Sequence, residues 1–347
     1  MHPLVDSYFT FIRKLIPANK ETTGVGIDIG AAEVKMAELT KTGEGYTLLN
    51  CAAEPVKGGD LAGAVAAVVA KCTIPPKNVI VSVYGKGTLI RYIDMPRMGL
   101  DDLRNSFAIE ADKYFPFSQD QIYTDCYILD PTAKAKNMRV MAAAAKREIV
   151  DTRLQLLTSL SLQSNFIGLN PVALANVVHL SPPKEGAPKV AAIFDFGDSV
   201  SSLTVLVDQV PRFNRDIYIG GRELTKRISN ALGLGFEEAE KLKCASTDKK
   251  NDILTACESL LANLMQELRL SFDYFSTENN ANVEHLYITG GSSKLESLME
   301  MLKENLEIPV EMWDPFAGIQ TTLSEEDKEV YKTKLGVALG LALYNYD

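Results

Sequence analysis

The chain has 347 residues, 46% of them hydrophobic and 23% charged, and its 45 acidic against 36 basic residues give a formal charge of -9. Single hydrophobic cores stop growing near ~250–300 residues, so this composition predicts an ordinary globular protein of about two domains and excludes disordered and collagen-like classes. The acidic balance, without a basic cluster long enough to follow a phosphate backbone, also excludes nucleic acid as an expected partner.

Residues 1–23 predict an amphipathic segment ahead of the folded part. Apolar residues between Leu4 and Ile16 recur at helical spacing, whereas Asp6, Arg13 and Lys14 fall largely elsewhere on the helix. Two interpretations stay open: the segment docks on a membrane surface or a partner, or it packs on its own domain or frays. No apolar run approaches the ~20 residues of a membrane span and the N-terminus is unlike a signal peptide, so we expect a cytoplasmic protein.

The first lobe is predicted to open with a three-stranded meander. Short apolar strands are separated by glycine-rich turns, and an alanine-rich crossover helix follows them. The predicted elements are strands at 24–30, 34–39, 46–51 and 78–84 and a helix at 61–72. We expect this lobe to occupy residues 24–87 and to be completed by residues 165–185.

Residues 88–164 predict a small α+β module inserted into the first lobe. Its expected elements are strands at 89–93, 122–129 and 138–145 and helices at 100–114 and 147–160.

A proline-rich stretch at 181–188 predicts a linker, because three prolines and a glycine forbid regular hydrogen bonding. The second lobe, expected over 186–347, then repeats the opening meander. Its predicted elements are strands at 189–196, 201–207, 212–218 and 284–289 and helices at 223–232, 237–244, 251–276 and 332–344.

Two segments share one chemical pattern and lie 167 residues apart. Asp28 and Gly30 end the first apolar strand, and Asp195 and Gly197 end the first strand of the second lobe. The glycine permits a tight turn that brings backbone N–H groups close to phosphate oxygens, and the acid can hold Mg²⁺ through water. One copy alone is a common turn, but two copies that each open a meander predict a shared nucleotide site.

Two further glycine pairs support this interpretation. Gly290 and Gly291 follow an apolar strand and precede a predicted helix that Ser292 or Ser293 would cap, so that a nucleotide can lie on bare backbone. Gly220 and Gly221 open a helix that precedes another carrying Glu240 and Lys243. These two side chains are three residues apart and share a face, and without the other elements they would be an exposed intrahelical pair.

At this point the chain resembles the actin, sugar kinase and Hsp70 superfamily across nearly its whole length. Within it, the opening Gly-Ile-Asp-Ile-Gly-Ala-Ala-Glu-Val-Lys segment, the Asp-Pro-Phe at 314–316 and the closing small-residue helix at 336–343 resemble the PilM family, actin-like proteins of type IV pilus assembly. The inserted module is also similar to the one that PilM and the division protein FtsA carry. The resemblance implies an actin-like (ribonuclease H-like) α/β fold of two lobes.

The resemblance implies that ATP and Mg²⁺ bind between the lobes, with Asp28 and Asp195 at the metal. The nucleotide-binding positions that it implies are Asp28, Gly30, Ala31, Ala32, Lys35, Asp195, Gly197, Gly220, Gly221, Glu240, Lys243, Gly290, Gly291 and Ser293. It further implies a partner, the cytoplasmic N-terminal peptide of a PilN-like inner-membrane protein, bound in a groove beside the inserted module. The chain would thus associate peripherally with the inner membrane through this partner, and self-association is a further expectation.

The chain departs from the family at the first phosphate turn. The family usually has three serines after the glycine, whereas this chain has Ala31, Ala32 and Glu33. Backbone N–H groups can still hold a phosphate, but Glu33 would repel it if the side chain points inward. Strand alternation favours an outward, solvated Glu33.

Two other functions stay open beside the ATP-binding scaffold with slow or absent turnover. A small-molecule kinase would need a carboxylate base in the cleft, for which Asp94, Asp101 and Asp102 are candidates that equally suit turns and helix caps. Asn170 is a positional candidate for handling water, with helix capping as the alternative. A filament-forming protein in the manner of FtsA is the other possibility.

Overall fold

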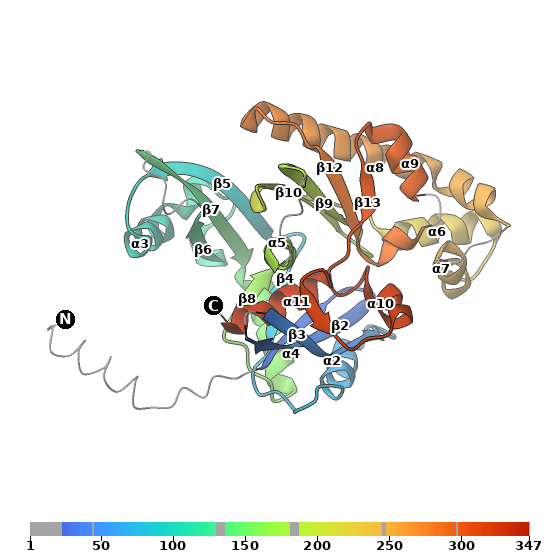
Figure 1. Cartoon of the computed structure of the whole chain (residues 1–347), viewed down its shortest axis with the longest axis horizontal. Coiled ribbons are helices and arrows are strands. Elements are labelled where there is room, and N and C mark those ends of the chain that lie inside the picture. Colours follow the sequence, from blue (N-terminus) through green and yellow to red (C-terminus); the bar gives the residue numbers. More distant parts are fainter. Residues whose placement is uncertain are drawn as a thin grey trace, which may run out of the picture.

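A computed structural model of the chain describes residues 23–43, 45–129, 136–180, 187–244, 248–295 and 298–346 (Figure 1). Nearly all of the predicted N-terminal segment and most of the predicted linker lie outside these residues. The described part contains two large sheets and a smaller one. The predicted α/β arrangement of two lobes, with a small α+β module inserted into the first, is therefore confirmed.

The first lobe is built on a six-stranded sheet with strand order β14-β3-β2-β1-β4-β8. Its strands are β1 (Thr23–Ile29), β2 (Glu33–Thr42), β3 (Gly45–Pro55), β4 (Ile80–Val83), β8 (Ile167–Leu169) and β14 (Ile319–Thr321). One face packs on α2 (Leu61–Val69) and α4 (Arg147–Ser159) through a cluster that includes Val25, Ile27 and Ile29. Because side chains alternate along a strand, Gly26 and Asp28 face the other way, toward the second lobe.

The second lobe repeats this plan on a five-stranded sheet with strand order β11-β10-β9-β12-β13. Its strands are β9 (Val190–Asp195), β10 (Ser201–Val207), β11 (Val210–Ile217), β12 (His285–Thr289) and β13 (Val310–Met312), and its helices are α6 (Gly221–Leu232), α7 (Phe236–Cys244), α8 (Lys250–Asn279) and α9 (Leu298–Leu306). In both lobes the first strand pairs antiparallel with the second and parallel with a later one. Val190, Ala192 and Phe194 face the helices, so Asp195 faces the first lobe.

The inserted module is a three-stranded sheet with one helix on its apolar face. Its elements are β5 (Thr88–Pro96), β6 (Ile122–Ile128), β7 (Asn137–Lys146), α3 (Leu100–Glu110) and the short turns η1 (Ala111–Lys113) and η2 (Gln119–Gln121). The strand order is β5-β7-β6, so β5 is an outer strand. In Figure 1 the module projects beside the second lobe, and β5 extends toward the region of β10.

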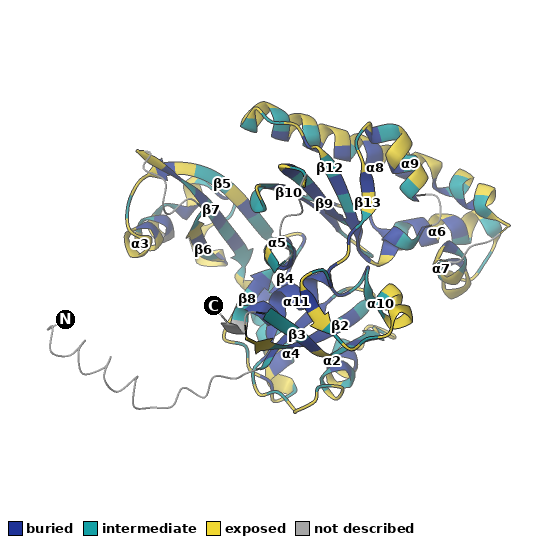
Figure 2. Ribbon diagram, in the orientation of Figure 1, coloured by how far each residue is buried: buried dark blue, intermediate teal, exposed yellow. Residues whose placement is uncertain are grey.

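Two helices fill the space between the large sheets. These are α5 (Asn170–Leu180) and α11 (Gly336–Ala342), which share one buried cluster with residues of both sheets, and Figure 2 shows α11 almost entirely buried. A Cβ on Gly340 would lie 1.8 Å from the carbonyl oxygen of Ala173, and one on Gly26 would lie 2.1 Å from that of Ala338. Glycine at these positions lets α11 approach both α5 and β1 at backbone distance.

The C-terminal part packs differently from the expectation. Everything after residue 186 was assigned to the second lobe, yet β14 pairs with β3 and α11 contacts β1 and β2 of the first sheet. The reason is that every residue of α11 is buried, so this helix needs apolar neighbours on all sides. The other predicted limits of the lobes and of the inserted module stay predictions.

The C-terminal helix expected over 332–344 is also shorter than predicted. It begins at Gly336, ends in the short turn η4 (Leu343–Tyr346), and is preceded by a helix that was not predicted, α10 (Glu325–Tyr331). Ser324 caps α10, because its hydroxyl accepts a hydrogen bond from the amide of Asp327 at 3.1 Å. Within the described residues, no helix combines the length and the apolar character that a membrane span requires.

Candidate functional site

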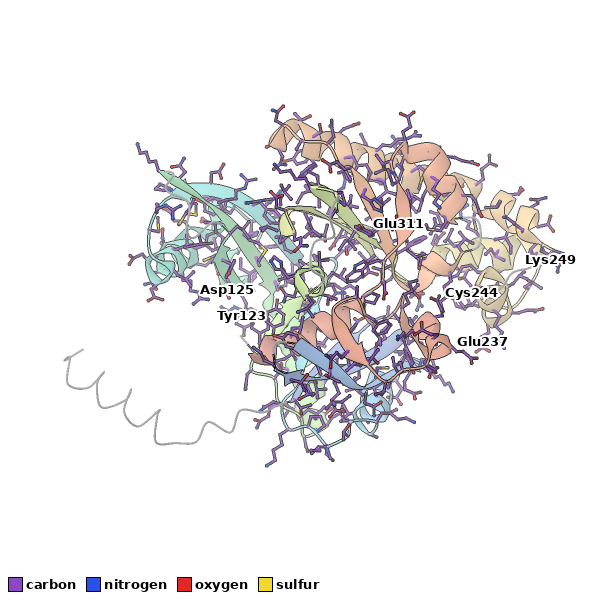
Figure 3. All side chains as sticks on the ribbon, in the orientation of Figure 1. Tyr123, Asp125, Glu237, Cys244, Lys249 and Glu311 are labelled. Atoms are coloured by element: carbon purple, nitrogen blue, oxygen red, sulfur yellow. The ribbon has the colours of Figure 1, made fainter. Side chains whose placement is uncertain are left out.

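A cavity of about 430 Å³ between the two lobes brings most of the predicted site residues together. The predicted residues that line it are Asp28, Gly30, Ala31, Ala32, Lys35, Asp195, Gly197, Glu240, Gly290 and Gly291. The other four predicted residues do not line the cavity. They are Gly220, Gly221, Lys243 and Ser293. Figure 3 shows Cys244, which also lines this cavity, on the opposite side of the molecule from Tyr123 and Asp125 of the inserted module.

The first corner of the cavity, formed by the end of β1 and the turn at Gly30, holds a mostly buried ion pair. Asp28 lies directly across the hairpin from Lys35, and the Lys35 Nζ is 3.0 Å from the Asp28 Oδ2. Burial disfavours the ammonium charge, but the charge and hydrogen bond of Asp28 outweigh it and raise the pKa of Lys35 above its ordinary value. Lys35 therefore stays charged inside the cavity, next to the turn at Ala31 and Ala32.

The second corner, formed by the end of β9 and the turn at Gly197, has the same strand and glycine turn but no lysine opposite the acid. Asp195 lies opposite Ser202 on the neighbouring strand and in register with Thr289 on β12. Burial, followed by the charge of Asp28, raises the pKa of Asp195 to about 6. This carboxylate is thus ionised near neutral pH, yet it is held in an environment that favours binding a proton or a cation.

The third glycine turn brings β12 against the second corner. Gly290 has φ 92°, and a Cβ there would lie 2.4 Å from the carbonyl oxygen of Phe196, so only glycine fits without strain. The expected helix cap is wrong. Ser292 and Ser293 lie in a short 3₁₀ turn, η3 (Gly291–Lys294), and their hydroxyls donate to the carbonyl oxygens of Gly197 and Gly290 at 2.9 and 2.6 Å. Ser292 joins this turn to the second corner, because its hydroxyl donates across to Gly197, whereas Ser293 bonds within its own turn.

Glu240 and Lys243 are not an exposed pair. The Lys243 side chain is only 2% exposed, and its Nζ donates to Glu240 at 2.8 Å, to Thr225 at 2.9 Å and to the carbonyl oxygen of Gly221 at 3.1 Å. These bonds fasten α7 to the start of α6. As a result Glu240 lines the cavity, while Lys243 does not line it and holds Glu240 in place.

The sequence did not reveal the part of the wall that comes from the C-terminal segment. Lys334 binds Glu33, with the Nζ 2.7 Å from the Oε1, so Glu33 lines the cavity as a neutralised pair and is neither a solvated residue nor a bare charge. Thr333 also lines the cavity, and its buried hydroxyl has no hydrogen-bond partner among the described residues. Nothing local in the sequence marks these residues, because they reach the site only when the chain returns to the first lobe.

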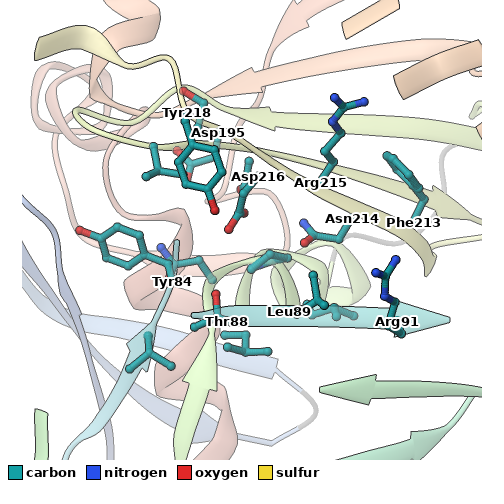
Figure 4. Close-up of a pocket in the computed structure, with 18 of the residues that line it drawn as sticks. Tyr84, Thr88, Leu89, Arg91, Asp195, Phe213, Asn214, Arg215, Asp216 and Tyr218 are labelled. Atoms are coloured by element: carbon teal, nitrogen blue, oxygen red, sulfur yellow. The ribbon is translucent and has the colours of Figure 1, made fainter. Parts of the chain in front are cut away.

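A second cavity, of about 450 Å³, adjoins the first and lies beside the inserted module (Figure 4). Tyr84, Asn170, Asp195 and Val200 line both cavities. Asn170 begins α5, and its side-chain oxygen accepts a hydrogen bond from Ser82 at 2.6 Å. Asn170 therefore lies at the junction of the two cavities, where a carboxamide can orient a water but cannot take up its proton.

The acids considered for a kinase reaction lie elsewhere. Asp94 pairs with Arg139 at 3.0 Å, and Asp101 and Asp102 occupy the first turn of α3, where acids favour the helix dipole. None of the three is among the described residues that line the two cavities.

The chain is similar to a known family and to several solved structures. The model of a family described as type IV pilus assembly protein PilM matches residues 26–346. The chain is similar to a solved structure described as a PilM-PilN type IV pilus biogenesis complex, with 25% identity, a TM-score of 0.83, and coverage of 93% of this chain and 98% of that one. It also shares the fold of the ethanolamine utilization protein EutJ from Carboxydothermus hydrogenoformans, with 15% identity, a TM-score of 0.54, and coverage of 93% and 89%.

Proposed function

The chain belongs to the family of type IV pilus assembly protein PilM, and from that premise we propose that it is an ATP-binding scaffold of type IV pilus or related secretion machinery. Its actin-like fold, predicted from the sequence, is the fold of this family. Closure of the two lobes on the nucleotide would set the shape of a peptide groove beside the inserted module.

One observation carries the nucleotide part of the proposal. Asp28 and Asp195 end corresponding strands of two different sheets, and both line one cavity of about 430 Å³, a volume typical of ligand sites. The turns that follow them are bare backbone at Gly30 and Gly197, and Lys35 supplies a cation. Asp28, Asp195 and Lys35, with the Thr333 hydroxyl that no described residue hydrogen-bonds, offer groups that fit a nucleoside triphosphate with its metal.

Asp28 and Asp195 suit Mg²⁺, which takes part of its coordination from phosphate and water, better than they suit a metal bound by protein side chains alone. Among the described residues, no cluster of three or more His, Cys, Asp or Glu side chains forms a metal cage. Mg²⁺ usually binds through one or two carboxylates, with phosphate oxygens and waters completing its coordination. Asp28 and Asp195 would hold the ion, which when bound neutralises phosphate charge.

The remaining residues bind and orient the phosphates. Lys35 stays charged beside the first turn, and the amides that follow Gly30 and Gly197 are positioned to donate to phosphate oxygens. Asn170 can orient a water without acting as a base, so we expect slow turnover or none.

The partner part of the proposal follows from the likeness to the PilM-PilN complex. We expect this chain to bind the cytoplasmic N-terminal peptide of a PilN-like inner-membrane protein. The cavity of Figure 4 suits this role, because residues 88–91 of the inserted module form one of its walls. The protein would then work in the cytoplasm and be held at the inner membrane through its partner.

The nucleotide site is tested by titrating Mg-ATP into the protein in a calorimeter. Asp195→Ala should abolish binding while the protein stays folded, because it removes one of the two carboxylates proposed to hold the metal. Asp120→Ala is the control, since it removes an exposed carboxylate from the inserted module. Unchanged affinity in Asp195→Ala would overturn the site.

A further inference from the structure

The second interlobe cavity has the walls of a site for extended backbone. Residues 88–91 of β5 and 213–216 of β11 line it, and each strand is the outer strand of its sheet. Side chains alternate between the faces of a strand, so four consecutive residues line a cavity only when the strand presents its edge. Each edge carries backbone N–H and C=O groups that no neighbouring strand pairs with. An extended chain between them is the ligand that such edges complement.

The cavity is also polarised along its length. Figure 4 shows Asp195 and Asp216 toward one end and Arg91 and Arg215 toward the other. Arg215 is paired with Glu267, whereas Arg91 is exposed and forms no ion pair with any described residue. A complementary ligand therefore carries a positive charge at the end near Asp195 and Asp216, and no positive charge near Arg91.

Asp216 is the acid that this second cavity does not share with the nucleotide cavity. It accepts a hydrogen bond from the backbone N–H of Gly85, the residue that leads from β4 toward the inserted module, yet burial raises its pKa to about 6. No cationic side chain in the described part of the chain lies within ion-pair distance of it. A half-buried carboxylate without a cationic partner is unfavourable, and an ammonium group would relieve that cost.

A second observation points to a polar ligand at the same end. Ser202 is 8% exposed and lines the cavity, and its hydroxyl has no hydrogen-bond partner among the described residues. Ser202 pairs directly with Asp216 across β10 and β11, as well as with Asp195 across β9 and β10. Buried hydroxyls are normally satisfied, so this one indicates a missing partner between the two acids.

We propose that this cavity binds the free α-ammonium end of an extended peptide, with Asp216 accepting the ammonium group, Ser202 hydrogen-bonding beside it, and the edges of β5 and β11 pairing with the peptide backbone. This inference rests on the proposed function, whose partner is an N-terminal peptide, and adds that its terminal amine is what the protein recognises. Internal segments of the same sequence lack that charge and are excluded.

The experiment compares two synthetic peptides of the cytoplasmic N-terminal segment of the PilN-like partner, one with a free amine and one N-acetylated, each labelled at its C-terminus. Fluorescence anisotropy with the full chain should show the acetylated peptide binding roughly tenfold or more weakly, as expected for the loss of a charged hydrogen bond. With Asp216→Asn the two peptides should bind alike and weakly.

Asp208→Asn is the matched control, because Asp208 lies in the turn of the same hairpin with φ 49°, a conformation that asparagine adopts readily. It should keep the preference for the free amine. The circular dichroism spectrum and the urea midpoint of Asp216→Asn report on its folding, since they do not depend on either cavity being occupied.

The outcomes separate this inference from the proposed function. Equal binding of the two peptides to the unmodified protein, or a preference that survives Asp216→Asn, overturns the ammonium site and leaves the proposed partner standing. Failure of both peptides to bind overturns the proposed partner, and the ammonium site with it.

Discussion

The two corners of the cavity that Asp28 and Asp195 line share a backbone plan and differ in charge. In each, an acid ends the first strand of a meander and a glycine turn follows. A Cβ on Gly30 would lie 2.7 Å from the carbonyl oxygen of Glu33, and one on Gly197 would lie 2.3 Å from that of Val200. Both turns therefore bring the backbone back on itself so closely that a side chain cannot fit.

The residue opposite the acid makes the difference. Lys35 lies across from Asp28 and pairs with it, whereas Ser202 lies across from Asp195 and adds no charge. The first corner is neutral within itself. The second keeps an acid that favours a proton or a cation. Two halves with the same fold can thus differ in the charge of their sites through a single cross-strand neighbour.

The largest expected contrast comes from neutralising each acid separately. Asp28→Asn should lower the free energy of unfolding by about 2 kcal/mol, because it leaves the mostly buried Lys35 ammonium unpaired; fully buried pairs cost more and exposed ones less. Asp195→Asn should raise it by about 1 kcal/mol at neutral pH, because it removes a carboxylate that burial destabilises. Urea unfolding without nucleotide measures both.

Opposite signs in the two variants are the result that matters. Lys35→Met should also lower stability, because it leaves the Asp28 carboxylate, whose side chain is only 8% exposed, without its cation. Equal destabilisation by Asp28→Asn and Asp195→Asn would mean that the corners do not differ electrostatically.

The next effect concerns pH and only the second corner. Burial raises the pKa of Asp195 to about 6, so at about pH 5 a proton must leave before the carboxylate can hold Mg²⁺. We expect affinity for Mg-ATP to fall roughly tenfold between about pH 7 and pH 5. Calorimetry at saturating magnesium in buffers of different ionisation enthalpy would detect the released proton.

Protonation of Asp195 does not itself promote unfolding at low pH. An acid whose pKa is higher in the folded than in the unfolded chain adds stability as the pH falls through about 6, because the folded state takes up the proton first. Asp216, whose pKa burial also raises to about 6, acts with the same sign. Affinity that stays constant down to about pH 5 would remove Asp195 from the metal site.

The smallest expected effect concerns the unusual turn of the first corner. Lys334 neutralises Glu33 at 2.7 Å, so Lys334→Met should leave a carboxylate facing the phosphates and weaken Mg-ATP binding about fivefold. Glu33→Gln alone should change little. The double variant Glu33→Gln/Lys334→Met should recover most of the affinity, and a double variant as weak as Lys334→Met would show that Lys334 acts on the nucleotide directly.

The sequence correctly placed Asp28 and Asp195 at the ends of the first strands of the two lobes, because the signals for strand ends are local. An apolar strand that ends in Asp-x-Gly places the acid on the face opposite the core residues, as alternation along β1 and β9 requires. The strand limits agree with the prediction to within a few residues for the same reason. Burial of Lys243 was missed, since its partners at Gly221 and Thr225 belong to another helix.

By itself, the sequence determined the two repeated meanders and the glycine turns, because hydrophobic period and turn chemistry act between near neighbours in the chain. The family followed from the resemblance of its motifs. Only the tertiary structure decided that Thr333 and Lys334 line the same cavity as Asp28 and Asp195, that Glu33 is neutralised, and that two strand edges line a second cavity. These contacts join residues hundreds of positions apart, or edges of different sheets, through the buried helices α5 and α11. Close packing at Gly340 and Ala173, which no local pattern specifies, joins α11, which contacts β1, to α5, which contacts β10 and β11.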